Sequence, residues 1–366
     1  MSVIVIDRYC DFVGLRRDWE EAYAVDVEAN YFLSWSFMST WLGREEDSQA
    51  RNQEGWFILA LRSGQPTSRY VAFLPLRLRK RQTATGVLND ELAMGGRKYA
   101  DYTGFVSRPE HRDAAIAAFL AHVKSLDWQR WRLECLRLSS AEIERWLRHF
   151  PTKLYDIRRV RTLNPGEDID QELCPYVPLS NDWESYLATR LSANARQKLR
   201  RLLRQVYGSD VYRITHAGPK TAERDIKILL HWWRTKWRDV KGDRLESMTR
   251  LIGTMLMRAF RTDTLFLPVL WEQNRPVAAL GILLDREKKT MLFSITGRDD
   301  TFEGPSPGLV LHAHSIREAI GRGYATYDFL RGNEPYKYSF GVEERRIDSF
   351  IITRRTTPTQ RMPVIR

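Results

Sequence analysis

Three apolar runs between residues 264 and 299 constrain the fold of this chain more than any other part of its sequence. They read TLFLPVLWEQ, RPVAALGILLD and KKTMLFSITGRD, and the short polar connections EQNRP and DREKK separate them. Connections of this length join antiparallel strands, because a parallel pair needs a crossover of a dozen or more residues. The region therefore predicts an antiparallel meander. Helices are predicted before it, and a loop, a helix and two strands after it, so the second half should form a mixed α/β domain.

The first half of the chain has a similar order of elements. Residues 55–81 read as a β-hairpin around the turn SGQPTS, followed by a predicted helix over 108–127 and a strand over 131–138. Between the halves, LNPGEDIDQELCPYVPLSND has the proline, glycine and acid content typical of a linker. The sequence therefore predicts two similar mixed α/β domains, at 1–165 and 183–366, with a linker at 166–182.

Composition and charge narrow the class of protein. The net charge of +12 suits an anionic partner such as nucleic acid, an acidic membrane surface or a polyphosphorylated cofactor, although solubility alone would also account for it. No apolar run is long enough to span a bilayer, and Asp7 and Arg8 interrupt the apolar start. Three widely spaced cysteines argue against a disulfide framework and a zinc site. We expect a cytoplasmic protein that binds no metal.

The stretch GPSPG at 304–308 predicts a helix start that could bind a phosphate. Ser306 suits the N-cap and Pro307 the first helical position. The backbone N–H groups of Gly308, Leu309 and Val310 would then be free to bind an anion. Ordinary helix capping explains the same residues, so both interpretations stay open.

A polar and aromatic cluster follows this helix. Asp328 lies near the end of a predicted strand, where a carboxylate can orient an amine or act as a base. The cluster continues with Arg331, Glu334, Tyr336, Lys337 and Tyr338. Either tyrosine could donate a proton to a leaving thiolate. A salt-bridged corner is an equally good interpretation of the charged members.

Residues 186–208 predict a basic helix. Leucines at four-residue spacing form a buried stripe, while the other faces carry Arg190, Arg196, Lys198, Arg200, Arg201 and Arg204. Such a helix could contact nucleic acid, an anionic membrane or the phosphates of a cofactor, or it could present a solvated face. Farther along, the group Trp232, Trp233 and Trp237 is a candidate cleft lining.

Several motifs together resemble one family. They are YFLSWSFMSTWL, DYTGF at Asp101, CPYVPL, LSANARQKLRRLLRQ and, as the most specific, SPGLVLHAHSIREAIGRGYATYDFLRGNEPYKYSFG. In this order they resemble the CelD-like branch of the GNAT acyltransferase superfamily, whose members are often encoded with polysaccharide-biosynthesis genes. The resemblance implies tandem GNAT-like domains, similar to Fem-type peptidoglycan transferases, each a mostly antiparallel mixed sheet flanked by helices.

The resemblance also implies a donor site in the second domain. An acyl-CoA would lie against a splayed pair of strands, with its thioester near Ser294 and Thr296. Its pyrophosphate would meet the helix start at Gly304, Ser306, Gly308 and Leu309, although GPSPG departs from the family pattern Q/R-x-x-G-x-G/A. The candidate catalytic residues are Asp328, Glu334 and Tyr336. The candidate substrate-binding residues are Asp101, Tyr102, Arg196, Arg331 and Lys337.

From these features we expect an N- or O-acyltransferase that moves an acyl group from acyl-CoA, first of all acetyl-CoA, to an amine or hydroxyl acceptor. The acceptor would be a small molecule or a glycan precursor in polysaccharide or cell-envelope biosynthesis. A Fem-type aminoacyl transferase using charged tRNA is the main alternative, and acyl carrier protein is a further candidate donor. A non-catalytic GNAT scaffold that binds a partner is the alternative outside enzymes.

Overall fold

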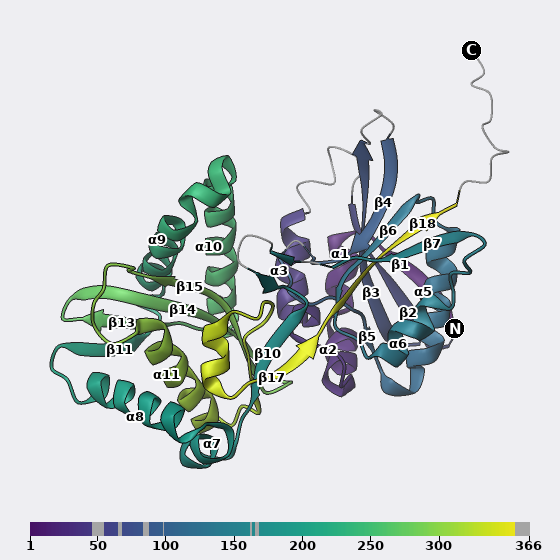
Figure 1. Cartoon of the computed structure of the whole chain (residues 1–366). Helices are drawn as coiled ribbons and strands as arrows, with labels where there is room; N and C mark the ends of the chain where they lie inside the picture. The colour runs from purple at the N-terminus through teal and green to yellow at the C-terminus, as the bar shows by residue number, and fades with distance from the viewer. Residues whose placement is uncertain are drawn as a thin grey trace. The chain divides into compact units, whose positions relative to one another are not determined.

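The computed structural model describes residues 1–45, 55–64, 68–82, 88–97, 99–161, 163–164 and 168–355. The chain divides into two compact units (Figure 1). Unit 1 comprises Met1–Thr162 together with Ile347–Arg366, and unit 2 comprises Leu163–Arg346. Each unit has its own sheet and its own hydrophobic core.

Unit 1 is built on a sheet of order β1-β2-β3-β4-β6-β18-β7, in which β5 pairs with β3. Its pairs are antiparallel except that β4 and β6 run parallel. The strands are β1 (Ser2–Ile6), β2 (Gly55–Arg62), β3 (Tyr70–Gln82), β4 (Leu88–Met94), β5 (Val106–Ser107), β6 (Arg130–Leu136), β7 (Tyr155–Arg159) and β18 (Asp348–Arg354). The helices are α1 (Tyr9–Gly14), α2 (Arg16–Val25), α3 (Trp35–Glu45), α5 (Arg112–Ser125) and α6 (Ser140–Leu147), with 3-10 turns at Tyr31–Leu33 and Pro109–His111.

Unit 2 is built on a sheet of order β11-β13-β14-β15-β16-β10-β17, in which β12 pairs with β14. Its strands are β10 (Leu173–Pro178), β11 (Tyr212–His216), β12 (Leu265–Phe266), β13 (Pro268–Glu272), β14 (Arg275–Asp285), β15 (Thr290–Arg298), β16 (Thr326–Asp328) and β17 (Glu343–Arg346). Its helices are α7 (Trp183–Arg190), α8 (Ala193–Tyr207), α9 (Ala222–Lys241), α10 (Leu245–Arg261) and α11 (Pro307–Gly321), with 3-10 turns η4 (Gly242–Arg244) and η5 (Pro335–Phe340). A two-stranded pair, β8 (Leu163–Asn164) and β9 (Ile169–Asp170), precedes them. The predicted meander is β13, β14 and β15, joined antiparallel.

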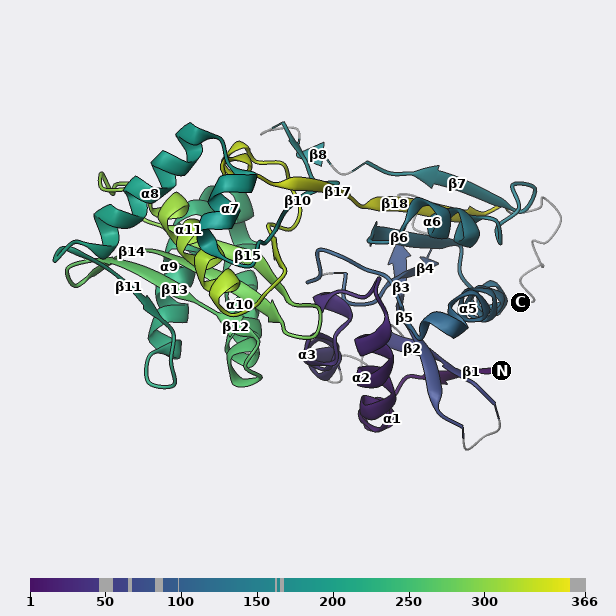
Figure 2. The same cartoon turned by 90° about the horizontal axis from the view of Figure 1, so that it is seen from below.

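Helices cover both faces of the second sheet (Figure 2). The helices α8 and α11 share one core cluster with sheet residues such as Val277 and Ile282. The helix α9 packs so closely on the other face that a Cβ added at Gly297 would lie 2.5 Å from the Leu229 carbonyl oxygen. Sheet and helices therefore form the layered α/β arrangement that the sequence predicts.

The two units repeat one order of elements. Each has a strand, helices, a three-stranded meander, a helix, and then a strand parallel to the end of the meander. In each sheet a further strand lies between this parallel strand and the edge strand. In unit 1, β18 lies between β6 and β7, and in unit 2, β10 lies between β16 and β17. The prediction of two similar mixed α/β domains is confirmed.

The observed division differs from the predicted boundaries at these two inserted strands. Residues 173–178 fall inside the predicted linker, yet they form β10, which pairs with both β16 and β17. The last strand of the chain, β18, lies within the predicted second domain at 183–366 but pairs with β6 and β7 of unit 1, as its yellow arrow among the blue strands shows (Figure 1). The proline and acidic residues of 166–182 are typical of a linker. A strand, however, is stabilised by backbone hydrogen bonds, so a segment of this composition can still pair with a sheet edge whose backbone groups are unpaired.

No helix in the part of the chain that the structure describes is long and apolar enough to cross a membrane.

Candidate functional site

The strands β15 and β16 separate shortly after they pair. They run parallel from Thr290↔Thr326 to Leu292↔Asp328, and their pairing ends there. Beyond this point β15 continues to Arg298, while the Phe329 N–H donates to the Pro175 carbonyl on the β10 side at 2.9 Å. We call this separation, between residues 293–298 of β15 and the chain after Asp328, the splay. Among the described residues, no strand pairs with this edge of β15 over 293–298.

A β-bulge marks the start of the splay. In the pairing of β14 with β15, Gly281 opposes Ile295 and Ile282 opposes Phe293, so Ser294 is an extra residue in β15. Ser294 is exposed and Thr296 is half-buried. A bulge changes the direction of backbone groups locally. The bulge therefore falls at Ser294, in the stretch of β15 where the family resemblance places the thioester of the donor.

Aromatic rings surround the splay on the α11 side. The His312 ring lies edge-on to Phe293 with 4.5 Å between centroids, and it stacks on Tyr336 at 5.6 Å. His312 is 2% exposed, and its Nδ1 lies 2.9 Å from the Tyr327 hydroxyl. Burial lowers the pKa of His312 to about 3, so the ring is neutral near pH 7. The sequence carries a signal for this residue, because His312 and His314 are two histidines within an otherwise apolar helical stretch.

Of the two candidate tyrosines, Tyr336 has the freer hydroxyl. The hydroxyl of Tyr338 donates to Glu344. Tyr336 is 37% exposed beside the splay, and burial, followed by the charge of Glu334, raises the pKa of its phenol above the usual value. A phenol that keeps its proton can serve as an acid and not as a base.

The start of α11 presents free backbone donors. Val310 N–H donates to the Ser306 carbonyl at 3.0 Å, which leaves Gly308 and Leu309 as the first-turn N–H groups without an intrahelical partner. Val310, predicted to be a free donor, is therefore engaged, and Ser306 makes no side-chain cap hydrogen bond. Apart from its chain neighbours and the backbone of its own helix, no atom of the described residues lies within 4 Å of a Cβ added at Gly308, whereas one added at Gly304 would meet the Phe302 ring. Gly308 therefore faces open space.

The charged cluster after β16 forms a tightly bonded corner. Asp328 is 2% exposed, accepting from the Leu330 N–H at 2.8 Å and from Arg345 at 3.1 Å. Lys337 is also 2% exposed, and its ammonium donates to the carbonyls of Arg331 and Gly332 at 2.9 and 2.8 Å. The structure thus realises the salt-bridged corner that the sequence left open.

The other charged candidates have different surroundings. Glu334 pairs with the Lys337 ammonium at 2.8 Å, and its side chain is 36% exposed. Arg331 donates to the Gln171 carbonyl at 3.1 Å. Arg196 lies on α8, where it donates to the carbonyls of Ala188 and Leu191. Asp101 and Tyr102 belong to unit 1.

Unit 1 has an equivalent pair of parallel strands, but its own chain fills the place between them. The β4–β6 pairing runs from Glu91↔Arg130 to Ala93↔Arg132. Just beyond it, the Thr103 N–H donates to the Cys135 carbonyl at 2.8 Å, and the Thr103 carbonyl accepts from the Arg137 N–H at 3.1 Å. The neighbouring side chain of Tyr102 is 1% exposed. The DYTGF motif therefore closes the position that is splayed in unit 2.

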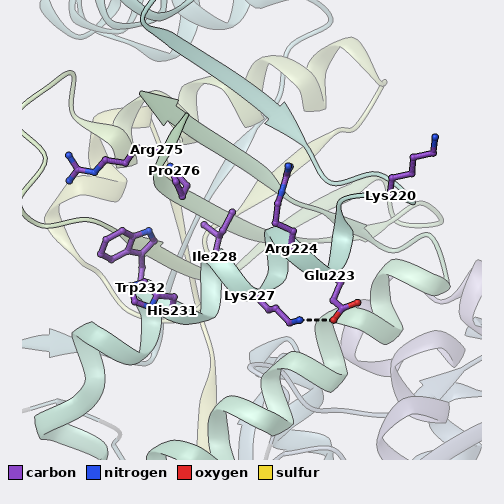
Figure 3. Close-up of a pocket in the computed structure, with 9 residues that line it drawn as sticks. All are labelled: Lys220, Glu223, Arg224, Lys227, Ile228, His231, Trp232, Arg275 and Pro276. Carbon is purple, nitrogen blue, oxygen red and sulfur yellow. Dashed lines mark hydrogen bonds and ion pairs between the residues drawn. The ribbon is translucent and has the colours of Figure 1, made fainter. Parts of the chain in front are cut away.

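A basic pocket of about 770 Å³ lies on α9 and the start of β14 (Figure 3). Its lining includes Lys220, Glu223, Arg224, Lys227, His231, Trp232 and Arg275, with Lys227 paired to Glu223 at 2.6 Å. Arg275 is paired with Asp299, the residue that follows β15. The pocket therefore lies at the end of the sheet where the chain leaves β15 for α11.

The predicted tryptophan lining is found there only in part. Trp232 lines the pocket, and its indole Nε1 is buried without a partner among the described residues. Trp233 is 8% exposed in the core, and Trp237 lies beneath the ammonium groups of Lys236 and Lys241. No group of histidine, cysteine and carboxylate side chains in the described part of the chain is arranged to hold a metal ion.

Comparison with known proteins assigns the fold. Residues 193–338 match the family model described as an acetyltransferase (GNAT) domain. This match contains β15, the splay and the start of α11. A comparison with curated proteins found no significant match.

Solved structures extend the likeness to both units. FemX matches with a TM-score of 0.63 and 8% identity, over 92% of this chain and 95% of its own. The C-terminal domain of a protein assigned as a lysylphosphatidylglycerol synthetase, from Agrobacterium fabrum, gives 0.54 and 8%, over 94% and 92%. A conserved protein of unknown function from Bacteroides thetaiotaomicron gives 0.53 and 12%, over 96% and 100%. The chain has a tandem GNAT fold related to that of FemX, as the sequence predicted.

Proposed function

We propose that this protein is an acyltransferase whose unit 2 binds an acyl-CoA, acetyl-CoA first of all, along the splay. The observation that carries this proposal is the separation of β15 from β16, together with the lack of a side-chain cap at the start of α11, the next element after β15 in the chain. The open strand edge can accept an extended chain, and the helix start can hold a pyrophosphate. Unit 1 would not bind a donor in the same way, because Thr103 occupies its equivalent position.

In this proposal the backbone binds the donor. The N–H groups of Gly308 and Leu309 hold the pyrophosphate, and Gly304 and Ser306 shape the preceding turn. Ser294 and Thr296 lie beside the thioester, where backbone donors of the bulged strand stabilise the oxyanion that forms on attack. The carbon–sulfur bond then breaks, and Tyr336 gives its proton to the thiolate. Holding donor and acceptor together supplies much of the acceleration, and these steps require no metal ion.

The acceptor is an amine or hydroxyl whose proton must pass to a base. Glu334 is the partly exposed carboxylate of the cluster, so we assign it this role. Asp328, buried and bonded to Arg345, orients the corner that carries Glu334 and Tyr336. We place the anionic part of the acceptor in the basic pocket of Figure 3, beside Arg275. A cytoplasmic small molecule or glycan precursor that carries negative charge fits this basic pocket. The resemblance to the CelD-like branch favours an acceptor from polysaccharide or cell-envelope biosynthesis.

A Fem-type aminoacyl transferase is the second candidate. The +12 net charge and the arginines of α8 suit charged tRNA as donor. Acyl carrier protein, an acidic donor, suits the same surface.

Calorimetric titration with acetyl-CoA, a long-chain acyl-CoA and free CoA tests the proposal. We expect micromolar binding that is lost in Gly308→Trp. The matched control is Gly321→Trp, at the other end of α11, where an added Cβ also meets no protein atom. Binding that survives Gly308→Trp would remove the helix start from the donor site. No binding to any of the three would reject acyl-CoA as the donor and turn the search to charged tRNA.

A further inference from the structure

A second basic pocket, of about 980 Å³, lies in unit 2 between α7, α8 and α11. Its lining carries four arginines and one glutamate, so its net charge is +3. Arg196, Arg200 and Arg204 follow one another at four-residue spacing on α8, which places them about 6 Å apart along one side of the helix. Arg317 joins them from α11. The charges therefore converge on one hollow.

Carboxylates of the described residues neutralise only part of this charge. Arg200 pairs with Glu184 of α7. Arg196 donates to two backbone carbonyls, which fix its position but leave its charge uncompensated. No carboxylate in the described part of the chain pairs with Arg196, Arg204 or Arg317. Arg317 is held in place over the ring of Tyr207, with 5.5 Å between its guanidinium carbon and the ring centroid.

A chain of hydrogen bonds ends at the same pocket. The Tyr207 hydroxyl lies 2.7 Å from His314 Nδ1, and His314 Nε2 lies 2.7 Å from His216 Nε2. His314 is 7% exposed, whereas His216 is exposed. A neutral imidazole donates through one nitrogen and accepts through the other, so this chain can run in either direction. When it runs from His216 to Tyr207, the phenolic hydrogen is free to point into the pocket.

We propose that this pocket binds the diphosphate group of a small molecule, at a site separate from the acyl-donor site. Guanidinium groups bind phosphate through paired hydrogen bonds, and the Tyr207 hydroxyl adds a neutral donor. The half-buried indole of Trp183 forms a further wall suited to a flat ring. The volume is that of a small-ligand pocket. The carboxylate of Glu184 in the lining would repel the additional negative charges of a polyanion longer than a diphosphate. The shared chemistry fits free diphosphate or a nucleoside diphosphate.

The test is calorimetric titration of the whole chain, at fixed ionic strength, with sodium pyrophosphate, uridine diphosphate and adenosine diphosphate. Stronger binding of a nucleotide than of pyrophosphate would identify a nucleotide source, and the reverse would identify the free anion. We expect Arg204→Gln to weaken binding at least about tenfold, because it removes a charged hydrogen bond to phosphate. Arg317→Gln, on a different helix, should do the same.

Arg201→Gln is the matched control. Arg201 is exposed on α8, three residues before Arg204, but it does not line the pocket, and its replacement changes the net charge equally. Its affinity should stay within about twofold of the wild type, because only a defined site distinguishes the two arginines. Equal losses in Arg201→Gln and Arg204→Gln would show diffuse attraction and overturn the proposal.

Two further results would also overturn it. In the first, the protein binds neither pyrophosphate nor a nucleotide but binds tRNA with an affinity that falls steeply as salt increases. The arginines would then form a nucleic-acid surface. The second is competition between acetyl-CoA and pyrophosphate that Arg204→Gln abolishes, which would make the pocket part of the donor site. Because no acyl donor is needed for the main titration, its result is independent of the proposed acyl transfer.

Discussion

Replacing Lys337 with methionine distinguishes a structural from a substrate-binding role for this residue. The Lys337 ammonium donates to two backbone carbonyls, of Arg331 and Gly332, and pairs with Glu334. Methionine fills the volume but leaves the two carbonyls without this donor, at about 1–3 kcal/mol each when buried. Glu334 is partly exposed, so water compensates most of its loss. We expect the corner to lose about 3 kcal/mol of stability.

Hydrogen exchange of the segment 328–340 is the suitable assay, because the two units need not unfold together and a single global transition is not assured. A loss of about 3 kcal/mol corresponds to exchange roughly 100-fold faster. The control is Lys198→Met on α8, whose side chain is exposed, and its exchange should match the wild type. Unchanged exchange in Lys337→Met together with weaker substrate binding would refute the structural argument and support the predicted substrate-binding role of Lys337.

Four further predictions follow from the same contacts. Gly297→Val should destabilise unit 2 by about 3 kcal/mol in urea unfolding, because its side chain would meet the backbone of α9, whereas Gly308→Ala should be tolerated. Asp328→Asn should lower the stability of unit 2 by about 3 kcal/mol, because Arg345 loses its buried partner; turnover that falls with stability unchanged would contradict this. Thr103→Val should lower the stability of unit 1 by about 1 kcal/mol, because the Thr103 hydroxyl loses its hydrogen bond to the Glu134 carbonyl. The affinity for acyl-CoA should not change, because Thr103 lies in unit 1 and the proposed donor site lies in unit 2. His312, whose folded pKa is about 3, stays neutral while the unfolded ring takes up a proton near pH 6.5, so its contribution to stability should fall as the pH decreases below about 6.5, by about 2 kcal/mol at pH 5. His312→Phe should remove this part of the pH dependence, while His314, whose pKa burial lowers to about 4, keeps its own part.

Local patterns in the sequence were sufficient for most element types and for the tandem GNAT fold. Turn residues and apolar periodicity predicted the meander of β13, β14 and β15, and the pair Ser306 and Pro307 predicted the start of α11. These features depend on neighbours within a few residues, so they can be read without knowing the fold. The motif carrying the GNAT resemblance lies in the same continuous stretch.

The tertiary structure decided which strands pair and which polar residues are buried. Nothing local to 173–178 or 348–354 says that these strands complete different sheets, because pairing depends on which backbone edge remains free after the rest has folded. Likewise the sequence offers Asp328 as a catalytic candidate and Lys337 as a substrate-binding candidate, but only the tertiary structure shows that both side chains are buried and that Asp328 pairs with the distant Arg345. The closure of the unit 1 strand gap by Thr103 and the hydrogen-bond chain from Tyr207 to His216 also join residues distant in sequence. The sequence by itself therefore determined most of the elements and the type of fold, whereas folding determined the strand partners and the accessibility of the site, because strand pairing and burial depend on contacts between distant residues.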